Sequence, residues 1–219
     1  MKLPTERYRT QVTTWPSEGK HILAHYDADS IVVYQAYRPS IGHYAVKHGA
    51  FGGEFSYSRM SWIKPNFLWM MYRSGWGTKE GQETTLGLRL RRQFFDSILV
   101  QAVASSLNQS DETSQQAWKA SLATSNVRLQ WDPDHDPHGN ALARRAIQLG
   151  LRGSVLEDFG KRELLEVIDM TEFVSGQREL LSRVGTSELR TPVERVYVPD
   201  DGAIARRLKL DRMATPPST

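Results

Sequence analysis

Alternation between apolar and polar residues is typical of β-strands, because successive side chains of a strand point to opposite faces. Leu86, Leu88 and Leu90 alternate with glycine and arginine, and the stretch SIVVYQAY is rich in β-branched and aromatic residues, which strands favour. On this basis we expect about six strands. They cover residues 30–37, 83–92, 126–131, 146–152, 164–170 and 192–199.

Helical spacing of apolar residues predicts about five helices between these strands. They cover residues 40–49, 65–73, 93–107, 115–123 and 171–184. Ser40 and Thr171 are expected to cap the N-termini of two of them, and Gly49 the C-terminus of the first. Residues 132–140 contain two prolines and a glycine, and predict a loop.

Strands and helices alternate irregularly, without a repeated βαβ unit. This order predicts an α+β fold with a mixed or split β-sheet flanked by helices. We expect an N-terminal arm over residues 1–20, one domain over 21–210 and a disordered tail over 211–219.

The composition and the motifs of the chain exclude several functional classes. The chain has 219 residues, a net charge of +3, a pI of about 9.2 and no cysteine, which excludes disulfides and thiolate chemistry. It lacks an apolar signal segment, and its longest apolar runs are far shorter than a membrane span requires. We therefore expect a soluble, cytoplasmic protein with no membrane partner. The motifs of P-loop proteins, dinucleotide-binding folds, zinc proteases and serine hydrolases are absent.

One stretch combines aromatic and cationic residues to an unusual degree. Residues 58–77 contain three tryptophans spaced seven apart. Its centre, residues 67–71, is apolar, and core packing is the simplest explanation for it. The cations flank this centre: they are Arg59, Lys64, Arg73 and Lys79. Cations beside aromatic rings suit a nucleotide, with charge for the phosphate and a ring face for the base. An alternative is that Glu83 neutralises part of this charge.

Two further patterns are candidates for chemistry. On strand 30–37, Gln35 and Tyr37 share one face, opposite Tyr34, and Gln148 lies on the polar face of strand 146–152. Either these residues face a cleft or their strands are half-buried edges. Residues 132–138 hold three aspartates and two histidines, which could bind a divalent metal ion. A rigid proline turn with local hydrogen bonds is the favoured alternative.

Several of these elements resemble an uncharacterised family catalogued as domain of unknown function 4291. The hallmark is the run RMSWIKPNFLWMMYRSGW at residues 59–76. The sequence also carries VYQAY at 33–37, QWDP at 130–133, IQLGL at 147–151 and PVERVY at 192–197. The elements follow in order and cover most of the chain. The family name implies no reaction.

The strand and helix at residues 30–51 also resemble the opening of ADP-ribosyltransferase-like enzymes, including RNA 2′-phosphotransferases. Gln35 stands where those enzymes have histidine or arginine, Ala36 where they have glycine and Tyr37 where they have threonine. Ser61 is the nearest match to their second element and Glu194 to their third. The resemblance implies an ADP-ribosyltransferase-like fold that binds NAD or an RNA-derived ribose phosphate, with nucleic acid as a candidate acceptor and no metal.

Under this hypothesis, cations hold phosphates, Gln35 and Tyr37 orient a ribose, Tyr72 or Trp76 stacks on a ring, and Glu194 stabilises the developing cation. The catalytic candidates are Gln35, Tyr37, Lys64 and Glu194. The cofactor-binding candidates are Tyr34, Arg59, Ser61, Tyr72, Arg73, Trp76 and Gln148. Two alternatives stay open. One is a non-catalytic RNA- or nucleotide-binding domain, and the other is a metal-dependent phosphoesterase that uses Asp132, Asp134 and His135.

Overall fold

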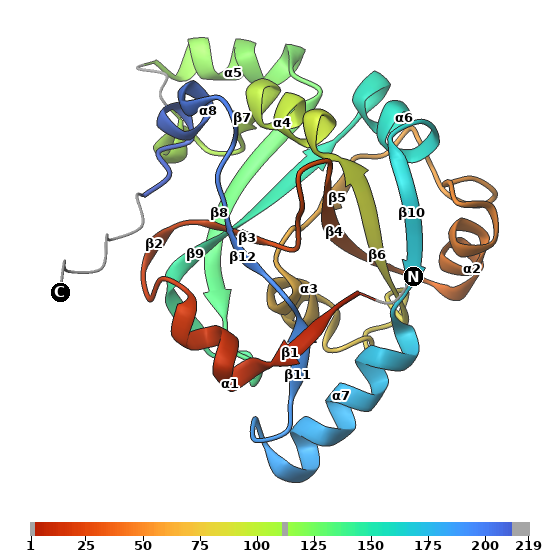
Figure 1. The fold of residues 1–219 in the computed structure, drawn as a ribbon. Coiled ribbons are helices and arrows are strands. Elements are labelled where there is room, and N and C mark those ends of the chain that lie inside the picture. Colours follow the sequence, from red (N-terminus) through yellow and green to blue (C-terminus); the bar gives the residue numbers. More distant parts are fainter. Residues whose placement is uncertain (1–2, 111–113, 212–219) are drawn as a thin grey trace, which may run out of the picture.

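Short sheets and helices surround two buried cores in the computed structural model, which describes residues 3–110 and 114–211 (Figure 1). Within that part of the chain the α-helices are α1 Tyr8–Gln11, α2 Pro39–His48, α3 Phe67–Ser74, α4 Arg92–Gln101, α5 Gln115–Thr124, α6 Gly153–Lys161, α7 Thr171–Val184 and α8 Gly202–Arg207. The strands are β1 Thr5–Arg7, β2 Gly19–Lys20, β3 Ile22–Ala24, β4 Ser30–Tyr37, β5 Ser61–Ile63, β6 Thr84–Arg91, β7 Val103–Ala104, β8 Val127–His135, β9 Ala141–Leu151, β10 Leu164–Asp169, β11 Arg190–Pro192 and β12 Arg195–Tyr197.

The strands form two main sheets. One is antiparallel, in the order β10-β6-β4. The other is mixed: β8 and β9 pair antiparallel, β7 pairs parallel with β8, and β2 pairs parallel with β9, which also pairs antiparallel with β5. Two-stranded pairs, β1 with β11 and β12 with β3, complete the structure. The fold is therefore α+β with a mixed sheet.

A backbone bridge between Tyr34 and Lys64 connects the two main sheets. The Tyr34 N–H donates to the Lys64 carbonyl at 2.7 Å, and the Lys64 N–H donates back to the Tyr34 carbonyl at 3.2 Å. Lys64 directly follows β5, so this bridge joins the β4 sheet to the β5–β9 edge. The C-terminal half of β4 thereby lies beside β5 and close to the mixed sheet.

Strand β4 is buried on both faces, because the side chains on each face enter a different core. Ile31 and Val33 belong to the larger core, and Val32 and Tyr34 belong to a second core with Phe67 of α3. A strand covered on both sides is apolar at nearly every position. The SIVVYQAY run has that pattern, and its first six residues are all buried.

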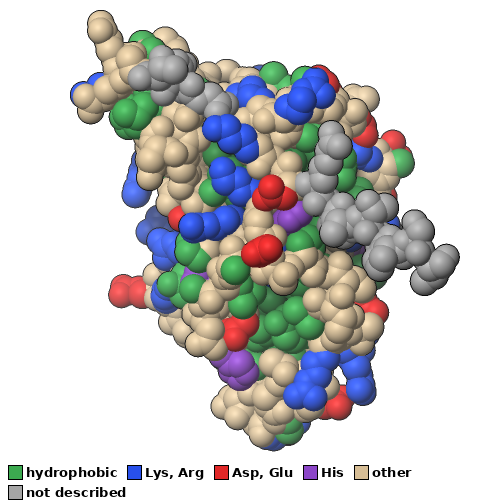
Figure 2. Space-filling model, turned by 90° about the vertical axis from the view of Figure 1, so that its left-hand side faces the viewer, with side chains coloured by type: hydrophobic (Ala, Val, Ile, Leu, Met, Phe, Trp, Pro, Cys, Tyr) green, Lys and Arg blue, Asp and Glu red, His purple; other side chains and the backbone are tan. Residues whose placement is uncertain are grey.

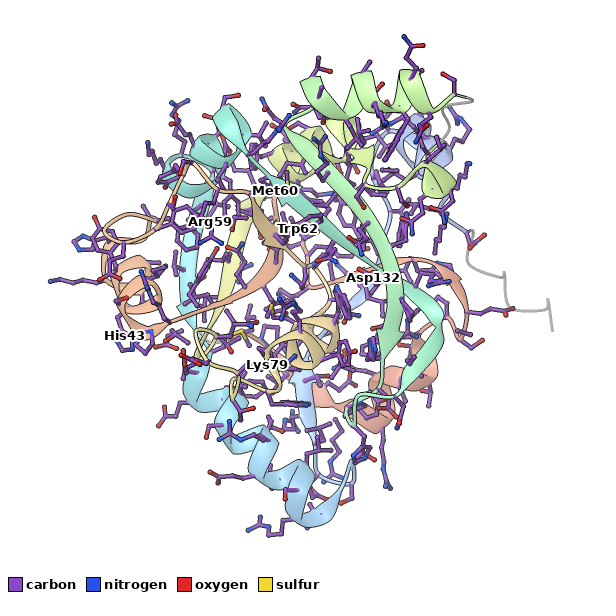
Figure 3. The ribbon with its side chains drawn as sticks, turned by 180° about the vertical axis from the view of Figure 1, so that it is seen from behind. His43, Arg59, Met60, Trp62, Lys79 and Asp132 are labelled. Carbon is purple, nitrogen blue, oxygen red and sulfur yellow. The ribbon has the colours of Figure 1, made fainter. Side chains whose placement is uncertain are left out.

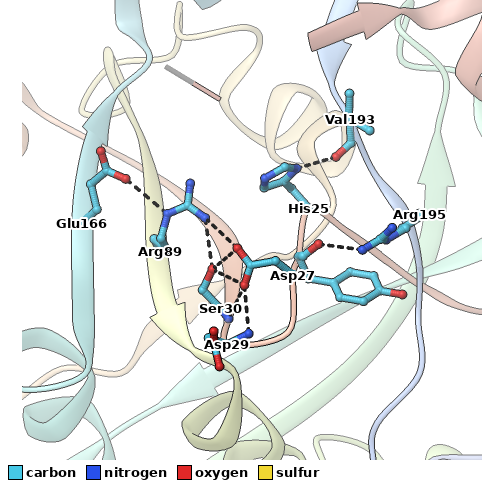
Figure 4. Close-up of polar contacts among 9 residues, drawn as sticks. His25, Asp27, Asp29, Ser30, Arg89, Glu166, Val193 and Arg195 are labelled. Carbon is cyan, nitrogen blue, oxygen red and sulfur yellow. Dashed lines mark hydrogen bonds and ion pairs between the residues drawn. The ribbon is translucent and has the colours of Figure 1, made fainter. Parts of the chain in front are cut away.

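The chain enters β4 through a polar turn that Asp27 organises (Figure 4). The Asp27 carboxylate accepts hydrogen bonds from the backbone N–H groups of Asp29 at 2.9 Å and Ser30 at 2.7 Å. Arg89 of β6 lies 3.8 Å from the same carboxylate and also pairs with Glu166 of β10 at 3.2 Å. The turn therefore ties the start of β4 to the two other strands of its sheet.

Several predicted elements have different ends in the structure. The helix predicted over 93–107 ends at Gln101, because Ala102 turns to extended backbone and β7 then pairs with β8. The expected loop at 132–140 begins as strand instead: β8 runs to His135, and Pro133 is tolerated because β7 pairs only with residues 128–129 and leaves that edge free. The predicted strand over 192–199 is two short strands, β11 and β12, with different partners.

Other differences concern helix ends and missed elements. Ser40 and Thr171 are not N-caps: α2 starts at Pro39, where Ser40 donates to Glu54, and Thr171 is the first residue of α7 and accepts from the Thr85 N–H. Gly49 does end α2, in the left-handed conformation at φ 64°. Helix α6 and strand β5 were not predicted, since each is short and depends on its packing partners.

Both ends of the described chain contact the rest of the fold. The expected arm over residues 1–20 contains β1, α1 and β2, which pair with or pack against later elements. Asp211 accepts a hydrogen bond from the Lys20 N–H at 2.8 Å, and the rest of the expected tail lies outside the described residues. Among residues 3–110 and 114–211, no helix is long and apolar enough to cross a membrane.

Candidate ligand-binding cavity

A cavity of about 490 Å³ lies where the two main sheets diverge. This volume is within the range of small-molecule sites, about 300–1,000 Å³. Strand β4, the segment around β5, helix α3 and strands β8 and β9 all contribute to its wall. Figure 3 labels Met60, which directly precedes β5, Trp62 on β5, and Asp132 on β8. The lining residues are Gln35, Ala36, Tyr37, Met60, Ser61, Trp62, Lys64, Met70, Arg73, Gln82, Gln130 and Gln148.

Ser61 joins the β4 side of the cavity to β5. The Gln35 amide N–H₂ donates to the Ser61 hydroxyl at 2.8 Å and to the Trp62 carbonyl at 3.0 Å. The Tyr37 hydroxyl lies 2.7 Å from the same serine oxygen, and burial raises the pKa of Tyr37. Both amide hydrogens of Gln35 are used, so its orientation is fixed. This cluster holds three polar side chains rigidly in one wall.

Lys64 is the least expected feature of the cavity. Its side chain is only 4% exposed, and its backbone is held by the bridge to Tyr34 and by the proline that follows. Its ammonium group has no hydrogen bond or ion pair within the described part of the chain. Burial, and then the charge of Arg73, lower the pKa of Lys64 to about 8, while Asp132 opposes the shift.

Arg73 adds a second cation at the exposed end of the cavity. It sits in the last turn of α3 and is exposed, and the described residues provide no carboxylate partner for it. Glu83, considered above as a counter-ion, accepts instead from the backbone N–H of Gly81 at 2.8 Å. Lys79 also has another role, since its ammonium donates to the Arg73 carbonyl at 2.8 Å and caps the end of α3.

Glutamines form the wall opposite Gln35. Gln130 of β8 and Gln148 of β9 are directly paired across the strands, and each donates to the Asp132 carboxylate at 2.7 Å. Asp132 is thereby fixed beside the cavity with both carboxylate oxygens occupied. The wall presents amide groups, and the only charges among the lining residues are those of Lys64 and Arg73. Such a cavity favours a ligand that carries negative charge and hydrogen-bonding groups.

The structure brings six of the candidate residues to this cavity: Gln35, Tyr37, Ser61, Lys64, Arg73 and Gln148. Arg59 is exposed and does not line it. Tyr34 points to the other face of β4 and is fully buried against Phe67. Tyr72 and Trp76 line a separate hollow of about 480 Å³, where the Trp76 indole donates to the Pro137 carbonyl at 3.1 Å.

Glu194 lies outside the cavity, buried beneath the start of α3. Its carboxylate accepts a hydrogen bond from the Phe67 N–H at 2.8 Å, at the positive end of the helix. Its own backbone is held by Gln11 and by the Trp15 indole. Burial raises the pKa of Glu194. In this position the carboxyl group stabilises a helix terminus.

The acidic residues in the last part of β8 also point to different partners. Asp134 forms a buried ion pair with Arg144, at 2.6 Å, whereas the Asp132 carboxylate contacts the glutamines. The His135 ring stacks on Tyr72, with ring centroids 3.5 Å apart. A register shift between Pro133 and His135 separates these side chains. Among the described residues, no group of three or more histidine, aspartate or glutamate side chains could hold a metal ion.

Six lining residues are not among the candidates from the sequence: Ala36, Met60, Trp62, Met70, Gln82 and Gln130. Trp62 is half-buried, so part of its ring faces the cavity. Gln130 lies within the QWDP element and precedes Asp132 by two positions. That spacing on one strand face is the signal that could have placed it beside the cavity.

The fold and site define an α+β domain with a cavity lined by cations and amides. A family model described as Domain of unknown function (DUF4291) matches residues 21–197. The chain belongs to this family, which confirms the resemblance seen in its sequence elements. No curated protein matches the chain. The family description names no reaction.

Proposed function

We propose that this protein binds a phosphorylated nucleoside in the cavity and acts on it as an ADP-ribosyltransferase-like enzyme. The substrate class would be NAD or an RNA-derived ribose phosphate. One observation carries the proposal: two cations, Lys64 and Arg73, face an amide-lined cavity without a carboxylate partner in the described residues. A ligand phosphate would supply the missing negative charge.

Different lining residues can bind different parts of such a ligand. Arg73, at the exposed end, suits a phosphate, and Lys64 lies deeper in the cavity. The Gln35–Ser61–Tyr37 cluster can hold ribose hydroxyl groups in a fixed orientation. The Trp62 ring can pack against a base or a nicotinamide.

The reaction would begin with cleavage of a glycosidic bond at the ribose. Both bonding electrons leave with the nicotinamide, and an oxocarbenium-like centre forms at the anomeric carbon. A carboxylate can stabilise that centre. Asp132 is the candidate, because its charge acts on Lys64 in the cavity and two glutamines fix its position. Glu194, the candidate from the sequence, contacts α3 instead.

The position of Glu194 also favours a second function. A non-catalytic nucleotide- or RNA-binding domain needs the cations and Trp62, but no catalytic carboxylate in the cavity.

Figure 2 shows a face on which Lys and Arg side chains are interspersed with Asp and Glu, so this face lacks a charge of single sign. We place the anion-binding site of either function in the cavity, because Lys64 and Arg73 line it.

Titration with NAD and with ADP-ribose, followed by tryptophan fluorescence, tests binding because Trp62 lies in the cavity wall. We expect quenching by both ligands, with affinity reduced about tenfold or more in Arg73→Gln, which corresponds to about 1.4 kcal/mol. Lys47→Met is the matched control, because Lys47 is exposed on α2 and does not line the cavity.

Release of nicotinamide, measured by chromatography, distinguishes the two functions. An enzyme releases nicotinamide from NAD, whereas a binding domain quenches without release. Binding only to RNA, with an affinity that falls steeply as salt increases, would favour the binding domain. Absence of fluorescence change with NAD, ADP-ribose and a 2′-phosphorylated RNA end would refute the proposal.

A further inference from the structure

The Lys64 side chain combines three properties that rarely occur together. It is 4% exposed, it lines a cavity large enough for a small ligand, and its nitrogen has no hydrogen-bonding or ionic partner within the described residues. Lysines are almost never fully buried unless they are paired. A lysine that only stabilised the fold would gain a carboxylate or carbonyl partner, as Lys79 does at the end of α3.

Burial and the charge of Arg73 increase the fraction of Lys64 that is a neutral amine, because they lower its pKa. Arg73 is a permanent cation whose charge acts against the ammonium form, and Asp132, the opposing carboxylate, already accepts two amide hydrogen bonds. An amine that is desolvated beside another cation is a nucleophile near neutral pH. Its characteristic partner is a carbonyl carbon, with which it forms a Schiff base.

We propose that Lys64 is a nucleophile that forms a Schiff base with the aldehyde form of a sugar phosphate bound in the cavity. The inference rests on the proposed function for its ligand class. After a glycosidic bond is cleaved by water, the ribose phosphate has a free anomeric carbon. Its ring opens reversibly to an aldehyde, and Arg73 can hold the attached phosphate.

The step balances without an oxidant or a reductant. The neutral Lys64 nitrogen attacks the aldehyde carbon, and the electrons of the C=O double bond move to oxygen. The carbinolamine takes up one proton and loses water, which leaves a protonated imine with a C=N bond to Lys64. The Gln35–Ser61–Tyr37 cluster lies in the same wall and can bind the hydroxyl groups of the open-chain sugar.

Reductive trapping tests the proposal. The full chain is incubated with ADP-ribose, with ribose 5-phosphate or with glycolaldehyde, each in the presence of cyanoborohydride, and the labelled peptides are mapped by mass spectrometry. We expect label on Lys64, with ribose 5-phosphate about tenfold more efficient than unphosphorylated ribose because Arg73 recruits its phosphate. Labelling of Lys64 should level off above pH about 8, whereas exposed lysines should gain label up to pH about 10.

Two variants separate chemistry from charge. Lys64→Arg keeps a cation in the cavity but cannot form an imine, so it should lose the label. Lys64→Met should lose the label as well, and Lys47→Met should keep it on Lys64. Circular dichroism and the thermal midpoint establish that each variant is folded.

The outcomes distinguish failure of this inference from failure of the proposed function. Binding of ADP-ribose without label on Lys64 would overturn the assignment of Lys64 as a nucleophile. Label spread equally over the exposed lysines would overturn it as well. Label on Lys64 from glycolaldehyde alone, with no binding of any phosphorylated probe, would establish a reactive lysine. This result would overturn both the assignment of a sugar phosphate as the ligand and the proposed function.

Discussion

Replacement of Lys64 by methionine should stabilise the protein at neutral pH. Methionine has a similar length and no charge, and it adapts to irregular apolar surroundings. In the native protein the Lys64 ammonium is buried without a partner among the described residues. Removing this group should therefore raise the free energy of unfolding, whereas most substitutions of buried residues lower it.

The magnitude follows from the pKa of Lys64, which burial and Arg73 lower from 10.5 to about 8. A tenfold change in an acid dissociation constant corresponds to about 1.4 kcal/mol, so the charged form costs the native state about 3 kcal/mol below pH 8. Between pH 8 and 10.5 the unfolded chain binds more protons than the native protein. The stability of the wild type should therefore rise with pH across this interval. The advantage of Lys64→Met should shrink over the same interval.

Urea denaturation at several pH values between 7 and 10 measures this difference. The buffers must lack phosphate and sulfate, because an anion bound beside Lys64 would stabilise the wild type. Comparing wild type with variant cancels the contributions of tyrosines that ionise near pH 10 in both unfolded chains. Lys47→Met, on the exposed face of α2, should match the wild type at every pH. A variant that is less stable than the wild type at pH 7, or an advantage that stays constant to pH 10, would refute the reasoning.

Three further substitutions test the surroundings of the cavity. Asp134→Asn should lower the free energy of unfolding by about 3–5 kcal/mol, measured in urea, because it leaves the buried Arg144 guanidinium without its ion pair. Gly150→Ala would place a methyl carbon 3.0 Å from the Trp62 ring, and should weaken ADP-ribose binding about tenfold by displacing that wall. Glu194→Gln keeps an oxygen acceptor for the first turn of α3, so affinity for ADP-ribose should stay within about twofold of the wild type.

Control substitutions accompany Asp134→Asn and Gly150→Ala, and one outcome of Glu194→Gln would contradict the assignment of Asp132. Asp29→Asn, at an exposed turn, should change stability by less than about 0.5 kcal/mol. Gly176→Ala lies on α7, where an added methyl group meets nothing within 4 Å, so ADP-ribose affinity should be unaffected. If Glu194→Gln abolished nicotinamide release, the catalytic role inferred from the sequence would return, and the assignment of Asp132 would be wrong.

The sequence predicted elements well where side-chain periodicity is local. The strand at 30–37 and the helix at 171–184 have the predicted ends, because their patterns depend only on the chain itself. The predictions were wrong where a partner that is distant in sequence determines the backbone conformation. Val103 and Ala104 leave the helical pattern to pair with β8, and β8 continues past Pro133 because β9 lies beside it.

By itself, the sequence determined the family, the α+β class and the residues around which a site could form. Its cationic aromatic stretch singled out Lys64 and Arg73 as candidates, because charge beside apolar residues is visible in a linear pattern. Only the tertiary structure decided that these cations face Gln35 and Gln148, since pairing of β5 with β9 and the bridge at Tyr34 bring distant segments together. It also placed Glu194 under a helix terminus. Burial and the absence of a partner in the described chain are properties of packing, and burial is the main cause of the lowered pKa of Lys64.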